Sequence, residues 1–341
     1  VTLGPRNYLG IGYSGAAVSI TVEGANIMTR SLMIFGQGAI RCHPYVLKEL
    51  AAQDNDDIKA FDEAFFGHAG LIFGNAARAF TQALGIGKAD VPFDSASRPY
   101  AQALARFSSA FGLCADAAMT TLGGELKMRE LISARLGDML ANLYLASMVL
   151  KNWYETQPVD GEKELMQYSM TLLLHRTEKA LDEFLKNLPN RPAAMALRAV
   201  TLPLGRRWAE PGDELTRKLA NSISTDTPVR SKLTESAWTT AGEGGVANPL
   251  AQYNSLLKDY GKAEQLYRKA TKAYAKGELP MTALHPEERF EAALEAGIFS
   301  QEEADFMREY EALVLEMLTV DDFPFDEFAR NKDTLIDHNP A

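Results

Sequence analysis

The residue with the clearest capacity for chemistry is Glu23, in the stretch SITVEGANIMTR (19–30). It follows the β-branched run ITV (20–22) and precedes Gly24, and an apolar helical pattern begins at about Asn26. A carboxylate just before a helix commonly interacts with the helix dipole, which contributes well under about 2 kcal/mol. The β-branched and small neighbours would instead desolvate the carboxylate and raise its proton affinity, as in a general base for a weakly acidic C–H bond. Gly24 would let a flat ligand approach the backbone. The local pattern leaves both roles open and favours the helix-start role.

The histidines give no comparable signal. None has a second His, Cys or carboxylate at a repeated ligand-like spacing, so the sequence predicts no metal site. They are His43, His68, His175, His285 and His338. The segment HRTEKALDE (175–183) is predicted to form a solvated helix face. The sequence contains no nucleophile elbow, phosphate-binding loop or dinucleotide fingerprint. The glycines of residues 4–15 are not a dinucleotide-binding loop, because they do not follow a strand and open a helix.

A basic segment, KDYGKAEQLYRKATKAYAK (258–276), carries six Lys or Arg against two acids and has three tyrosines. It has the composition of a helix that meets anionic lipid or a phosphate-bearing ligand. The alternative is a solvated helix face whose tyrosines pack inward, opposite the acidic region 302–327. We favour the alternative, because runs of charge usually form solvated faces.

Composition limits the classes of protein. The formal net charge of −10 argues against nucleic-acid binding, because phosphates would repel the chain. The two cysteines, Cys42 and Cys114, make no disulfide framework and indicate a reducing, cytoplasmic compartment, with Cys114 in the core.

No stretch reaches the roughly 18 apolar residues of a membrane span, since Asp138 and Asn142 interrupt the most apolar one. The sequence does not decide whether a helix lies on a membrane surface. The turn-rich start without an initiator methionine suggests the C-terminal part of a longer polypeptide.

The elements that must position these residues are helices. Apolar residues recur every three or four positions along several long segments, and Gly- and Pro-rich stops separate them, which predicts an all-α antiparallel helical bundle. The clearest stripe is Ile132, Leu136, Met139, Leu143, Ala146, Leu150 and Trp153. A helix is also predicted to restart at HPYVLKELAAQ (43–53), with Pro44 in its first turn. The other predicted helices are 26–35, 56–84, 98–122, 129–154, 162–188, 247–277, 286–296 and 301–318, with a rougher region between the fifth and sixth of these.

Four blocks of the sequence resemble one family. They are GPRNYLGIGYSGAAVSITVEGANIMTRSLMIFGQGAIRCHPYVLKEL (4–50), LGGELKMRELISARLGDMLANLYLASMVLK (122–151), FLKNLPNRPAAMALRAVTLPLGRRW (184–208) and LTVDDF (318–323). They resemble the long bacterial acyl-CoA dehydrogenases of fatty-acid β-oxidation, which have a large helical C-terminal extension. The resemblance extends over essentially the whole chain.

The resemblance implies a role for the opening residue. The family's base is the glutamate of a Glu-Gly pattern, which falls here on Glu23, and it removes the α-proton of a fatty acyl-CoA while the β-hydride passes to FAD. Many members have a flavin-binding Thr where this chain has Ala25, so the implied flavin contacts are Gly24 and Asn26 only. Arg30 matches a family arginine and is expected to orient the helix rather than to bind a ligand.

The resemblance also implies an organisation. Residues 1–52 would complete the dehydrogenase's C-terminal helical domain, and residues 53–341 would form the helical extension. The flavin-binding domains would precede this chain, so the fragment alone is expected to be inactive. Implied partners are a fatty acyl-CoA, an electron-transfer flavoprotein as acceptor, further copies of the subunit, and a peripheral contact with the inner face of the cytoplasmic membrane. The alternative is a non-catalytic helical module for protein interaction or membrane association.

Overall fold

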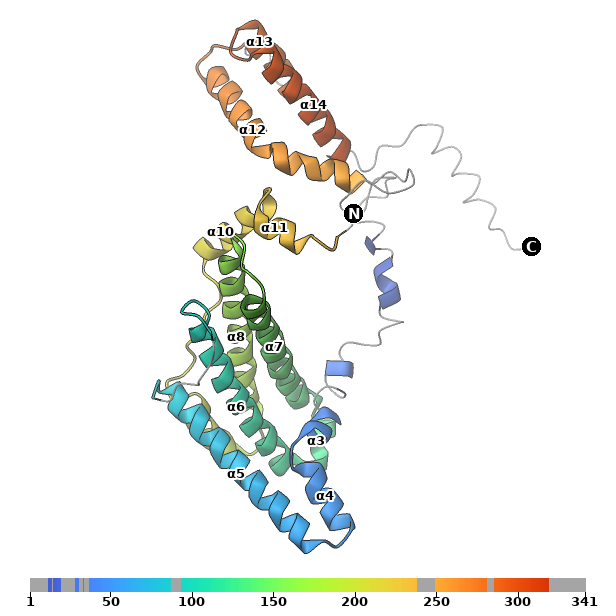
Figure 1. The fold of residues 1–341 in the computed structure, drawn as a ribbon, viewed down its shortest axis with the longest axis vertical. Coiled ribbons are helices and arrows are strands. Elements are labelled where there is room, and N and C mark those ends of the chain that lie inside the picture. Colours follow the sequence, from blue (N-terminus) through green and yellow to red (C-terminus); the bar gives the residue numbers. More distant parts are fainter. Residues whose placement is uncertain are drawn as a thin grey trace, which may run out of the picture. The chain divides into compact units, whose positions relative to one another are not determined.

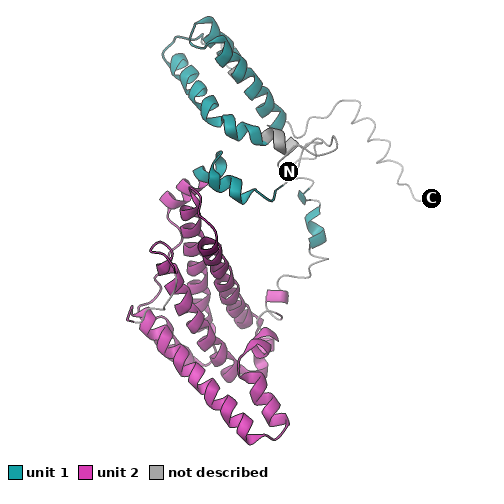
Figure 2. Ribbon diagram, viewed as in Figure 1, with its two compact units in different colours: residues 1–19, 221–341 teal, residues 20–220 magenta. Residues whose placement is uncertain are grey.

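A computed structural model describes residues 12–13, 15–19, 28–30, 33, 37–86, 93–237, 249–280 and 285–318. Every regular element in these ranges is a helix, which confirms the predicted all-α class (Figure 1). The chain divides into two compact units, residues 20–220 and residues 1–19 with 221–341 (Figure 2). The predicted boundary between residues 52 and 53 lies inside the first of these units, and it stays a prediction.

The unit of residues 20–220 is a bundle of long helices. Its helices are α3 (Gly38–Cys42), α4 (Val46–Asp54), α5 (Ile58–Ala83), α6 (Arg98–Leu122), the 3-10 helix η2 (Gly123–Met128), α7 (Glu130–Glu155), α8 (Glu162–Asn187), α9 (Arg191–Thr201) and most of α10 (Asp213–Ser224). Helix α7 packs along α8, α6 packs along both α5 and α7, and α4 packs on α5 (Figure 1). The long predicted helices therefore agree with the structure to within about two residues, which is the usual uncertainty of helix ends.

The bundle's core follows the sequence stripes. The α7 stripe is buried from Ile132 to Leu150, and Trp153 at its end packs against the same core. Phe107 of α6 and Phe184 of α8 are fully buried in this core, and so is Cys114. Apolar burial stabilises by roughly 25 cal/mol per Å², so these stripes provide most of the driving force for association of the helices.

Helix α4 begins later than predicted. Pro44 lies before the helix, which starts at Val46, rather than in its first turn. The reason is local: Nδ1 of His43 accepts hydrogen bonds from the backbone N–H groups of Tyr45 (3.2 Å) and Val46 (3.1 Å). These two donors would otherwise lack partners at the helix start.

The segment 175–183 is not the solvated face that we predicted. Glu178 is fully buried and Asp182 is 5% exposed, because the chain after α9 and helix α9 itself cover this face of α8. Asp182 forms ion pairs with Lys186 (2.8 Å) and Arg198. Burial alone would raise the pKa of Asp182, but hydrogen bonds from these two cations outweigh it and lower the pKa. A charge is buried at lower cost when it is paired, as Asp182 is, or hydrogen-bonded, as Glu178 is by the backbone N–H groups of Arg207 and Trp208.

The other unit contains α11 (Pro228–Leu233), α12 (Pro249–Ala275), α13 (Pro286–Glu295) and α14 (Gln301–Leu318). Helices α12, α13 and α14 share a small core around Phe290 and Met307. The basic helix α12 faces acidic residues of α14, with Lys269 2.9 Å from Glu303 and the Tyr267 hydroxyl donating to Glu311. This agrees with the solvated-face alternative for the basic segment, except that Tyr260 is 43% exposed, whereas Tyr267 and Tyr274 pack inward as predicted. In the part of the chain that the structure describes, no helix is long and apolar enough to cross a membrane.

Candidate functional site

The predicted catalytic segment is described only at its C-terminal side. Glu23, Gly24 and Asn26 lie outside the described residues, as does Ala25. Residues 28–30 are described and helical. The contacts of Arg30, seven residues after Glu23, therefore show how the chain beyond the predicted base is held.

Arg30 pairs with Asp138 in the middle of α7. Its Nε and Nη2 donate to Oδ1 and Oδ2 of Asp138, each at 2.5 Å, which is a bidentate fork. The hydrogen bond to Asp138 raises the pKa of Arg30, a change that burial partly opposes. The side chains are 44% and 35% exposed, so solvent screens the pair and its share of global stability is about 1 kcal/mol or less. What the pair provides is orientation, the role expected for Arg30.

The backbone also approaches α7 closely at this point. Gly137 is buried, and a Cβ added to it would lie 2.8 Å from the backbone oxygen of Arg30. The absence of a side chain at Gly137 therefore allows the segment after Glu23 to lie directly on the helix. Asp138 was visible in the sequence only as a charge that interrupts the most apolar stretch.

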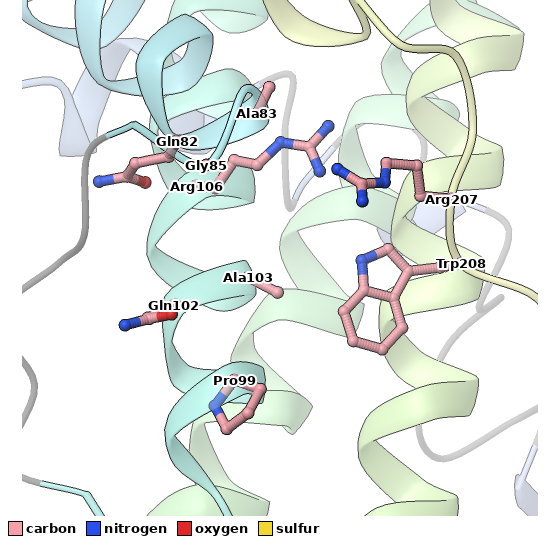
Figure 3. A pocket seen from close by; sticks show the side chains of 9 residues that line it. All are labelled: Gln82, Ala83, Gly85, Pro99, Gln102, Ala103, Arg106, Arg207 and Trp208. Atoms are coloured by element: carbon pink, nitrogen blue, oxygen red, sulfur yellow. The ribbon is translucent and has the colours of Figure 1, made fainter.

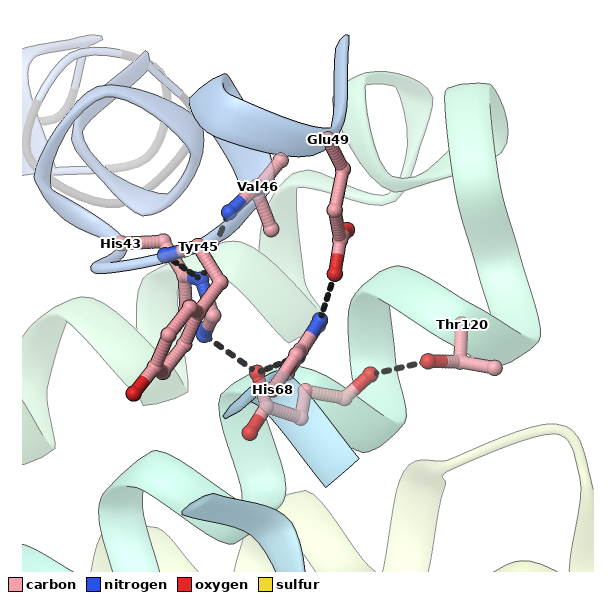
Figure 4. Close-up of polar contacts among 7 residues, drawn as sticks. His43, Tyr45, Val46, Glu49, His68 and Thr120 are labelled. Carbon is pink, nitrogen blue, oxygen red and sulfur yellow. Dashed lines mark hydrogen bonds and ion pairs between the residues drawn. The ribbon is translucent and has the colours of Figure 1, made fainter. Parts of the chain in front are cut away.

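A second polar cluster joins the next part of the chain to the bundle (Figure 4). His43 Nε2 lies 3.0 Å from Oδ1 of Asp116, and His68 Nε2 lies 3.4 Å from the same oxygen. The other ring nitrogen of His68, Nδ1, lies 2.9 Å from Oε1 of Glu49. Asp116 of α6 is 3% exposed. The cluster thus connects the chain before α4, α4 itself, α5 and α6 through side chains up to 73 residues apart in sequence, from His43 to Asp116.

The cluster has the composition of a metal site, since one ligand atom each of His43, His68 and Asp116 lies within 4.8 Å of the others. The tautomer of His43 argues against that use. Its Nδ1 accepts two backbone N–H groups, so the ring proton is on Nε2, the atom that faces Asp116. Metal-binding histidines show the opposite pattern, in which the second nitrogen donates to an acceptor. We therefore interpret the cluster as a polar network that holds the start of α4, and the predicted absence of a metal site stays a prediction.

The rings of this network lie close together, and those of His43 and His68 are tilted by 53°. The centroids of His43 and His68 lie 4.5 Å apart, and Tyr45 stacks on His68 at 6.2 Å with an interplanar angle of 13°. A Cβ added at Gly67 would lie 2.5 Å from Cε1 of Tyr45, so this ring requires a glycine beneath it. Burial lowers the pKa of His43, while Asp116 acts to raise it, which favours the neutral ring.

These features define a helical positioning domain. Its described residues hold Arg30 on α7 and anchor the chain before α4. Residues 40–323 match the family of bacterial-type acyl-CoA dehydrogenase C-terminal domains, and the chain belongs to this family. It is thus part of an acyl-CoA dehydrogenase, an oxidoreductase. No solved structure matches the chain.

Proposed function

We propose that this chain is the C-terminal part of an FAD-dependent enzyme that oxidises fatty acyl-CoA to trans-2-enoyl-CoA in fatty-acid β-oxidation, with Glu23 as its base. The observation that carries the proposal is the family match over residues 40–323. Glu23 precedes the matched region and belongs to the block 4–50 that resembles the long bacterial acyl-CoA dehydrogenases. The Arg30–Asp138 pair supports the link, because it joins the segment of Glu23 to the matched helices.

In the proposed reaction the Glu23 carboxylate takes the proton from the α-carbon of the thioester. The electrons of that C–H bond form the new C=C bond as a hydride leaves the β-carbon. FAD, when bound, supplies the hydride acceptor. Gly24 and Asn26 are the flavin contacts that we propose from this chain; they lie outside the described residues, so no step is derived from their geometry.

The described residues act on this reaction through position. A base must lie within hydrogen-bond reach of the proton that it removes, and a displacement of about 1 Å can reduce the rate by about a hundredfold. Arg30 is seven residues after Glu23, and a chain of seven residues spans at most about 25 Å. Fixing Arg30 on Asp138 therefore limits the positions available to Glu23.

The test uses the complete enzyme with its flavin. Glu23→Gln is expected to abolish bleaching of the flavin by acyl-CoA under anaerobic conditions, while the absorbance of bound FAD remains. The control is Glu125→Gln, which removes an exposed carboxylate that pairs only with Arg129 on the surface. Bleaching of the Glu23→Gln enzyme at the wild-type rate would show that the base assignment is wrong.

We also propose an electron-transfer flavoprotein as acceptor, a homo-oligomeric enzyme, a cytoplasmic location and a peripheral membrane contact. The acceptor and the oligomeric state rest on the resemblance alone, the location rests also on the two cysteines, and the membrane contact rests also on the basic segment 258–276. For the membrane contact, Lys258 and Lys272 on α12 are exposed, whereas Lys269 is paired with Glu303. Vesicle sedimentation of the chain with Lys258 and Lys272 changed to Gln should show weaker binding to anionic lipid, and equal binding would contradict the contact.

A further inference from the structure

A cavity of about 430 Å³ opens in the helical bundle (Figure 3). It lies between the C-terminal end of α5, the first half of α6 and the chain that follows α9. Two arginines line it, Arg106 from α6 and Arg207 from the chain after α9, and their guanidinium groups point toward each other (Figure 3). All of these residues belong to the unit of residues 20–220.

Arg106 is a buried cation with unused hydrogen-bonding capacity. It is 7% exposed, and its Nη2 donates to the backbone oxygen of Thr201 at 2.9 Å. Its Nε is buried and has no hydrogen-bond partner among the described residues. Burial lowers the pKa of Arg106; the charge of Glu178 opposes this effect and that of Arg207 adds to it. A buried donor without a partner is unfavourable, so an acceptor at this place would stabilise it.

The charges around the cavity do not balance. Glu178 is the buried carboxylate whose charge raises the pKa of Arg106. Its Oε2 already accepts two backbone N–H groups, from Arg207 and Trp208, each at 2.8 Å. No ion pair joins Glu178 to either arginine in the described part of the chain. Arg207 is exposed to solvent, so the charge that lacks compensation is the buried one of Arg106. A bound anion would neutralise it.

The size and walls of the cavity indicate that the anion is part of a larger ligand. Cavities that bind small organic molecules have volumes of about 300–1,000 Å³, whereas one water takes only about 30 Å³. Beside the arginines the lining includes Pro99, Ala103 and the ring of Trp208, which is half-buried and packs at 5.9 Å from the ring of Tyr100. Two glutamines, Gln82 and Gln102, also line the cavity. The apolar and aromatic part of the wall suits a flat ring rather than a hydrated ion.

We propose that this cavity binds a nucleotide, with a phosphate group between Arg106 and Arg207 and the base against Trp208. Guanidinium groups match phosphate oxygens in charge and in geometry, and an aromatic side chain is a common platform for a base. The inference does not rest on the proposed dehydrogenase function, because none of its residues belongs to the segment of Glu23.

The experiment is calorimetric titration of the 341-residue chain with ADP, pyrophosphate and adenosine. ADP should bind, pyrophosphate should bind more weakly, and adenosine should bind least, because it lacks the charged group. Arg207→Gln should weaken ADP binding by about tenfold or more, the usual worth of a charge-assisted hydrogen bond. Arg206→Gln is the matched control, since Arg206 is exposed like Arg207 but does not line the cavity, and it should leave binding unchanged.

Trp208→Leu tests the second half of the proposal. It should weaken binding of ADP but leave that of pyrophosphate nearly unchanged, since only the base would contact the ring. Circular dichroism of each variant verifies that the helices are retained. No binding of ADP at about 1 mM, equal effects of Arg206→Gln and Arg207→Gln, or adenosine binding as tightly as ADP would overturn the proposal.

Discussion

Replacing Gly137 by alanine should separate the stability of the bundle from the placement of the segment that carries Glu23. Gly137 is buried within α7, next to the partner of Arg30. The added Cβ would lie 2.8 Å from the backbone oxygen of Arg30, a distance that real Cβ atoms essentially never show. Because the obstructing atom is backbone, it is the segment around Arg30 that must move.

The substitution has two effects on the free energy of unfolding, and they have opposite signs. Alanine inside a helix is favoured over glycine by about 0.5–1 kcal/mol, which stabilises α7. Overpacking costs about 1–3 kcal/mol if the segment stays in place, but the cost falls if the segment moves away. The Arg30–Asp138 pair that resists this movement is exposed and contributes about 1 kcal/mol or less. We therefore expect the melting temperature to change by a few degrees at most, while the segment moves away from α7.

Hydrogen exchange and activity measure the displacement. Amides of residues 28–33 should exchange faster in Gly137→Ala than in the wild type, and the complete enzyme should lose turnover while it retains its flavin. Gly70→Ala is the control, because Gly70 lies on α5 with nothing within 4 Å of the added Cβ. If both variants exchange and turn over like the wild type, Gly137 does not position this segment and the reasoning is refuted.

Two further results follow from burial. Burial lowers the pKa of His43, against the effect of Asp116, so the folded protein binds fewer protons at this ring than the unfolded chain does. The contribution of His43 to the free energy of unfolding should therefore be complete at pH values above the unfolded-state pKa of about 6.5. As the pH decreases below that value, the free energy of unfolding should decrease by at most about 1.4 kcal/mol per pH unit. Urea titrations as a function of pH measure this slope, and His43→Gln should flatten it; an unchanged slope contradicts the assignment. Cys42 is exposed, whereas burial raises the pKa of the fully buried Cys114, so a thiol reagent should modify one cysteine in the native protein and two in denaturant. Rapid modification of both in the native state would contradict the burial of Cys114.

The long helices could be predicted because their apolar stripes repeat over many turns. The predicted range 98–122 matches α6, and 301–318 matches α14. Helix α9 (Arg191–Thr201) lies in the rougher region after residue 188, for which the sequence predicted no helix, because LPNRP (188–192) has the composition of a helix stop. The same residues also begin the next one, since the Asn190 side chain accepts from the backbone N–H of Ala193 and a proline occupies the first turn.

The polar contacts could be predicted much less well. Periodicity indicates which face of a helix is buried, but it does not say which distant side chains meet on that face. His43, His68 and Asp116 are separated by 25 and 48 residues, so no spacing rule relates them. Asp116 did carry a signal, because it is a carboxylate two residues after Cys114 in an apolar stripe. The contacts of Glu178 could not be predicted either, because its burial depends on backbone N–H groups about 30 residues away.

The contact of Tyr45 with Gly67 has a consequence for how such sequences can diverge. Any side chain at position 67 would collide with the ring of Tyr45, whereas a smaller residue at position 45 would remove the collision and leave a void beside His68. Substitutions at these two positions are therefore expected to be epistatic. Among relatives, glycine at position 67 and an aromatic residue at position 45 should covary, and a lineage that loses one should soon lose the other.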